Sequence, residues 1–116
     1  MLDVHDLSGP QNFLPTVATF SIPGAEPHNF WLDEQSGVLY VAWHGHGVWA
    51  IDVTGPLLGD LREQGREIAN IQYDSGDCET AGPLGTGTCS YSVQLHDGLV
   101  YVSDYTSGLW VLDLSP

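Results

Sequence analysis

The chain has 116 residues, 42% of them hydrophobic, and this length suits one modest domain rather than two. Only 2 Lys and Arg oppose 15 Asp and Glu, so the formal charge is −13, and long-range repulsion excludes nucleic acid and anionic membranes as default partners. No stretch approaches the run of about 18 apolar residues that spans a membrane, and the N-terminus lacks the charge and apolar pattern of a signal peptide.

Residues 1–27 are expected to supply the last two strands of a four-stranded unit. The stretch VHDLSGP (4–10) is similar to AIDVTGP (50–56), which ends a predicted strand. TVATFSI (16–22) is rich in β-branched and aromatic residues and predicts the next strand. The first 27 residues are therefore expected to belong to a neighbouring unit.

Residues 28–74 predict a complete unit of four antiparallel strands. HNFWLD (28–33) predicts the first strand, and GVLYVAWHGHGVWAIDVT (37–54) predicts a β-hairpin, because two apolar runs flank four turn-type residues ending in Gly. A turn-like or briefly helical piece, LLGDLREQG (57–65), then leads to a fourth strand, EIANIQYD (67–74). The apolar runs do not alternate cleanly, which predicts strands covered on both faces.

Residues 75–89 predict a loop that contains both cysteines, Cys78 and Cys89. A disulfide between them would close a ring of about 12 residues, stabilise the fold by about 3 kcal/mol, and indicate an oxidising compartment. Two free thiols are the alternative.

Residues 90–116 repeat the first three strands of the preceding unit. SYSVQLH (90–96) predicts the first strand, and GLVYVSDYTSGLWVLDLS (98–115) aligns without gaps on residues 37–54, with 6 of 18 positions identical. The four dissimilar positions are consecutive and lie at the hairpin tip: Trp43-His44-Gly45-His46 against Asp104-Tyr105-Thr106-Ser107. The chain is therefore expected to be a single all-β domain whose repeat fails only at this tip.

The signatures G-x-x-Y-V and G-[VL]-W-x-[IL]-D-[VL]-[ST] resemble β-propeller repeats, most closely those of the LVIVD-repeat family, over about three-quarters of the chain. The resemblance implies antiparallel four-stranded blades, about two in this chain, and thus a partial propeller. Because closed propellers have about four to eight blades, it implies completion by further copies, another protein or further sequence. The stretch SDYTSGLW (103–110) departs from the sialidase Asp-box, because Asp104 stands four rather than two residues before the Gly. AIDVTG also looks like the repeat of pyrroloquinoline-quinone dehydrogenases, but their catalytic Asp and Ca²⁺ ligands cannot be placed here.

Propeller geometry would place the hairpin tips and the start of each first strand on one face. Trp43, His44, His46, Asp104 and Tyr105 are therefore candidate partner-binding or ligand-binding residues, and no catalytic residue is assigned. The alternative role for Trp43 is packing in the protein interior. Trp49 and Trp110 occupy equivalent positions of the two units, and this repetition predicts packing between sheets.

Metal binding is a further hypothesis. Imidazole is the commonest ligand for transition metals, so His28, His44 and His46 form a candidate site, with polar turn residues as the alternative interpretation. Two clusters of acidic residues could hold Ca²⁺ through their carboxylate oxygens or could simply be solvated loop residues. One cluster is Asp33 with Glu34, and the other is Asp74 with Asp77 and Glu79.

The favoured function is a non-catalytic interaction or assembly module, exported to the cell surface, periplasm or medium, and completed by a protein partner or by copies of itself. The alternative is a metal-dependent oxidoreductase, similar to the selenium-binding propellers thought to use histidines and copper.

Overall fold

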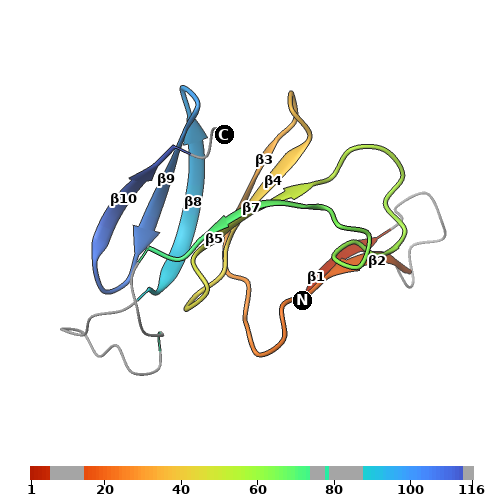
Figure 1. Ribbon diagram of the computed structural model, residues 1–116, viewed down its shortest axis with the longest axis horizontal. Coiled ribbons are helices and arrows are strands. Elements are labelled where there is room, and N and C mark those ends of the chain that lie inside the picture. Colours follow the sequence, from red (N-terminus) through yellow and green to blue (C-terminus); the bar gives the residue numbers. More distant parts are fainter. Residues whose placement is uncertain (6–14, 74–77, 79–87, 114–116) are drawn as a thin grey trace.

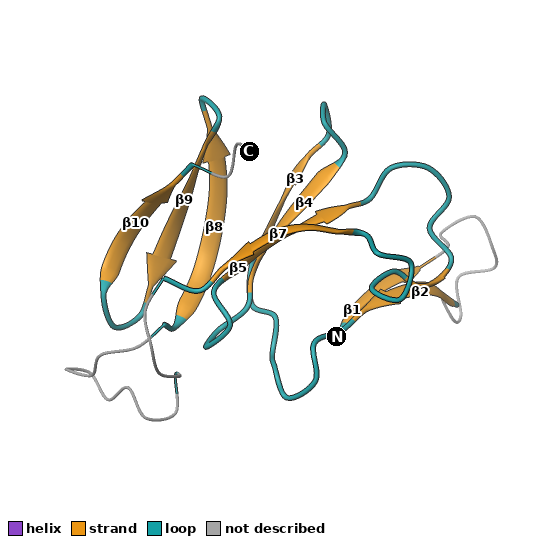
Figure 2. Cartoon of the chain, in the orientation of Figure 1, coloured by secondary structure: helices purple, strands orange, loops and turns teal. Residues whose placement is uncertain are grey.

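The computed structural model describes residues 1–5, 15–73, 78 and 88–113 of the protein, which form ten strands in three sheets (Figures 1 and 2). These described residues contain no helix, which confirms the all-β expectation. A helix long and apolar enough to cross a membrane is accordingly not found among them.

The first sheet contains β1 (Leu2–His5), β2 (Thr16–Phe20) and β6 (Gly59–Asp60), in the order β1-β2-β6. β1 and β2 are antiparallel, with Leu2 opposite Phe20. The piece at 57–65, expected to be turn-like or briefly helical, forms β6 and a turn, and β6 pairs with β2 in parallel over two residues.

The second sheet contains β3 (Phe30–Asp33), β4 (Val38–Ala42), β5 (Val48–Asp52) and β7 (Glu67–Ile71), in chain order and antiparallel throughout. This confirms the four predicted strands of residues 28–74. The turn from β4 to β5 is closed by the bond from the Trp43 amide to the Gly47 carbonyl, 2.8 Å. Gly47 has a φ of 75°, a conformation that glycine adopts without steric cost.

The third sheet contains β8 (Ser90–His96), β9 (Leu99–Asp104) and β10 (Gly108–Leu112), again antiparallel. Its hairpin reproduces the register of the second sheet, because Val102 lies opposite Trp110 just as Val41 lies opposite Trp49. The internal repeat of the sequence is therefore a repeat of strand pairing.

The second sheet lies between the other two (Figure 1), and each interface has its own hydrophobic core. The core toward the first sheet contains buried side chains of β2, β4 and β5 together with Trp43 and Leu61. The core toward the third sheet contains Ala42, Val48, Val93, Val100, Val102 and Leu112. β5 is buried from Val48 to Ile51 because both of its faces are covered, as its unbroken apolar run predicted.

A disulfide joins Cys78 to Cys89, whose Cα atoms are 4.9 Å apart, and this confirms the predicted pairing. It ties residue 78 to the residue that precedes β8. The bond is consistent with an oxidising extracellular or periplasmic location.

Candidate functional site

The β4–β5 tip, where the sequence repeat fails, begins with a core residue. Trp43 is fully buried, and its ring centroid lies 5.8 Å from that of Phe20 and 6.3 Å from that of Trp49. It continues the strand alternation of Val41, two residues earlier, into the same core. Trp43 thus packs the first sheet against the second and does not reach the surface of the described chain.

His44 turns in the opposite direction, toward the third sheet. Its φ of 24° is uncommon for a residue other than glycine. Its carbonyl accepts a hydrogen bond from the Ser90 amide at 3.0 Å, and its ring lies 5.6 Å from the Tyr91 ring. The tip of one hairpin is therefore attached to the start of β8 in the neighbouring sheet.

The His44 imidazole occupies an unusual electrostatic position. Its Nε2 is buried and has no hydrogen-bond partner among the described residues. Burial, together with the nearby His28, lowers the His44 pKa below its ordinary value, while Glu26 acts in the opposite direction. The His44 ring therefore binds a proton less readily than an ordinary imidazole.

His28, just before β3, joins the same cluster of rings. Its Nδ1 lies 2.8 Å from the Tyr91 carbonyl oxygen, and its ring centroid is 4.1 Å from that of Tyr91 and 5.0 Å from that of His44. Tyr91 in turn lies 5.8 Å from Tyr105 on the β9–β10 tip. We call His28, His44, Tyr91 and Tyr105 the ring cluster.

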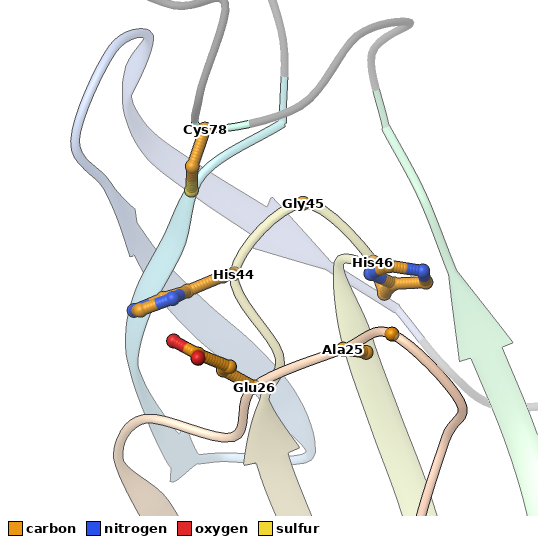
Figure 3. A pocket seen from close by; sticks show the side chains of 7 residues that line it. Ala25, Glu26, His44, Gly45, His46 and Cys78 are labelled. Atoms are coloured by element: carbon orange, nitrogen blue, oxygen red, sulfur yellow. The ribbon is translucent and has the colours of Figure 1, made fainter.

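A cavity of about 280 Å³ adjoins the ring cluster. Its lining consists of Gly24, Ala25, Glu26, His44, Gly45, His46 and Cys78. Figure 3 shows that His44 and His46 extend to opposite sides of the turn and that the Glu26 carboxylate lies beside the His44 ring. The cavity thus carries an acidic group beside the His44 ring.

The three histidines of the metal hypothesis are not gathered at one point. The structure brings His28 and His44 together and directs His46 elsewhere. Across the described ranges, no group of three or more His, Cys, Asp or Glu side chains could hold a metal ion.

The carboxylates considered for Ca²⁺ belong to two parts of the chain, of which the structure describes only the first, Asp33 with Glu34. Asp33 accepts hydrogen bonds from the Gln35 amide and from the Ser36 hydroxyl, which closes the β3–β4 turn. Glu34 is exposed in that turn. Asp74, Asp77 and Glu79 lie outside the described residues.

Asp104, expected at a binding tip, is only 6% exposed and accepts hydrogen bonds from several groups. The donors are the Tyr73 hydroxyl, the Cys89, Thr106 and Ser107 amides and the Thr106 hydroxyl, at 2.6 to 2.8 Å. Asp104 therefore organises the β9–β10 tip and the start of β8, whereas Tyr105 beside it is exposed.

Three residues of this region were not singled out from the sequence. Tyr91 carries no motif, and it reaches the ring cluster where the β8–β9 register shifts between Ser90 and Ser92. Glu26 and Tyr73 are unremarkable in sequence, and their partners His44 and Asp104 are distant along the chain. The only sequence signal for Tyr73 was its own position, as an aromatic residue near the end of a predicted strand.

Exposed rings beside a carboxylate are groups that can contact a ligand or a partner. The ring cluster provides aromatic faces, one neighbouring carboxylate and backbone groups already engaged in hydrogen bonds. Comparisons of the chain with protein-family models, curated proteins and solved structures find no match. The resemblance to propeller repeats therefore stays a prediction that depends on the residues themselves.

Proposed function

We propose that the chain is a non-catalytic, exported β-propeller module of the LVIVD-repeat type, whose three sheets are successive blades of a larger ring. In that ring, the outer face of the third sheet packs against a further sheet supplied by another copy of the chain. Its function is to assemble and to present the face that carries the hairpin tips.

The observation that carries this proposal is the different exposure of equivalent residues. Val48 and Ala50 of the second sheet face the third sheet and are 0% and 2% exposed. Their counterparts in the repeat, Leu109 and Val111, are 67% and 51% exposed on the outer face of the third sheet. The same strand positions are thus core residues where a sheet covers them and surface residues where no described sheet does.

The incompletely covered face of the second sheet supports the same interpretation. Phe30 and Leu32 of β3 are exposed beside the first sheet. Val93, which pairs with Val102 as Phe30 pairs with Val41, is buried because the larger second sheet covers it. Exposed apolar surface on both the second and the third sheets favours association.

Composition and covalent structure support the proposed compartment. The Cys78–Cys89 disulfide persists in an oxidising environment, and the charge of −13 suits an extracellular or periplasmic protein. Both observations support export.

Light scattering of the full chain tests the proposal. We expect a mass above the 12.6 kDa of one chain, and we expect Leu109→Glu with Val111→Glu to return the mass to that of one chain, because two buried charges oppose sheet packing. Ile68→Glu, which adds one negative charge at an exposed apolar residue of β7, serves as the control beside the single variants Leu109→Glu and Val111→Glu and should leave the mass unchanged.

A single species of 12.6 kDa at the highest soluble concentration of the unaltered chain would contradict self-assembly. An assembly that survives the Leu109 and Val111 substitutions would show that a different surface mediates it.

A further inference from the structure

The ring cluster forms a surface distinct from the sheet face that mediates the proposed assembly. It lies where the β4–β5 tip, the residues before β3 and the start of β8 meet. Tyr91 is 41% exposed and Tyr105 is 63% exposed, although both rings are held in defined contacts. Exposed aromatic rings of this kind are typical anchors of binding surfaces.

The rings are held in place before any partner arrives. The His28 ring is fixed by its bond to the Tyr91 carbonyl, and the Asn29 amide bonds to the same carbonyl at 3.2 Å. The Tyr105 amide donates to the Cys89 carbonyl at 2.9 Å. A partner would therefore lose little of its binding free energy in ordering this surface.

The charge of the surroundings is negative. Glu26 is exposed at the edge of the adjoining cavity, and its carboxylate lies beside the His44 ring. The only Lys or Arg residues of the chain are Arg62 and Arg66. Arg66 donates to the Thr54 and Pro56 carbonyls, and Arg62 lies 6.0 Å from the Trp49 ring centroid, so both contact other parts of the molecule.

Aromatic faces in a negative environment attract cations, because the face of a π-system is itself electronegative. A planar guanidinium or an ammonium group can lie over a tyrosine ring while its charge is balanced by a neighbouring carboxylate. The same charge distribution repels phosphate-bearing partners.

We propose that the ring cluster docks a segment of a partner protein that carries arginine or lysine side chains. The cationic side chains lie over the faces of Tyr91 and Tyr105, and Glu26 balances the charge at the cavity edge. This surface and the outer face of the third sheet are separate, so the inference does not depend on the assembly proposed above.

Titration of the full chain with labelled synthetic peptides tests the inference. The probe is a short Gly-Ser peptide with several Arg residues, and the reference is the same peptide with Gln at those positions. We expect saturable binding of the Arg peptide, followed by fluorescence anisotropy, and much weaker binding of the Gln peptide.

Variants assign the binding to the ring cluster. Tyr91→Ala with Tyr105→Ala should lower the affinity for the Arg peptide about 10-fold, whereas Phe at both positions should retain it because the ring faces remain. Glu26→Gln should lower the affinity about 3-fold, while Glu63→Gln, the same loss of charge in a distant exposed turn, should not change it. Tyr105→Ala alone provides the test if the double variant does not fold.

Three results would overturn the inference. Equal binding of the Arg and Gln peptides would exclude recognition of charge, and unchanged affinity in the tyrosine-to-alanine variants would place the binding elsewhere. Free arginine amide bound as tightly as the peptide would indicate a site for small molecules. Leu109→Glu with Val111→Glu should leave peptide binding intact, which separates this inference from the assembly.

Discussion

At the scale of single residues, Asp104 shows how a tip residue becomes structural. Burial alone would raise its pKa, but hydrogen bonds from Tyr73, from the backbone of Cys89 and Ser107, and from Thr106 outweigh burial and lower the pKa to about 2. Burial likewise raises the pKa of Tyr73, so the phenol stays protonated and can donate to the carboxylate.

This carboxylate should make folding sensitive to acid. Because the folded pKa of about 2 lies below the ordinary value of 3.8, its stabilisation is complete above about pH 4 and is lost as the pH falls toward 2. We expect Asp104→Asn to lower the free energy of unfolding at pH 7 by about 2 kcal/mol and to flatten its pH dependence between about pH 4 and 2. Urea unfolding at several pH values measures both effects.

Asp52 is the matched control, because it also accepts hydrogen bonds from the amide and hydroxyl of a threonine two residues later but is exposed to solvent. Asp52→Asn should have a clearly smaller effect. Equal stability of Asp104→Asn and the unaltered chain would contradict the assigned role of Asp104.

At the scale of strands and turns, two glycines that align in the repeat have different surroundings. Gly47 has a φ of 75°, and a Cβ atom there would lie 1.9 Å from the Ile71 carbonyl oxygen on β7. Gly108 has a φ of 92°, and a Cβ atom there would meet nothing within 4 Å. The difference arises because β7 lies beside β5, whereas β10 is an edge strand of its described sheet.

Alanine substitution should reveal this difference. Gly108→Ala should cost about 1 kcal/mol from backbone strain, whereas Gly47→Ala should cost about 3 kcal/mol or more because the backbone of β7 must move. Thermal unfolding followed by circular dichroism compares the two variants. Similar losses of stability would show that β7 does not approach Gly47 as described.

At the scale of the whole molecule, net charge opposes the packing of apolar faces. Each chain carries a formal charge of −13, so copies repel one another at low salt while the exposed Leu109 and Val111 favour contact. We expect the proposed assembly to strengthen as NaCl rises from about 20 mM to about 500 mM, because salt screens the repulsion more than it weakens apolar burial. Sedimentation velocity measures the change, and an assembly that dissociates in salt would indicate that ion pairs hold it together.

Much of the architecture could be predicted because it depends on local pattern. Apolar runs around turn residues located the strands, and the gapless match of the two hairpins predicted their common register, now seen at Val41–Trp49 and Val102–Trp110. The short separation of Cys78 and Cys89 likewise predicted their disulfide. Strand alternation also connects Val41 to Trp43, so the burial of Trp43 could have been inferred from the repeat.

The candidate site could be predicted only in part. The sequence by itself determined that the repeat fails at Trp43-His44-Gly45-His46, and it predicted that His28 and His44 would share a face. Only the tertiary structure decided that His44 meets Tyr91, that Asp104 meets Tyr73, and that Leu109 is exposed where Val48 is buried. The physical reason is that backbone geometry imposes strand periodicity residue by residue, whereas burial and ring contacts depend on which sheet packs against which.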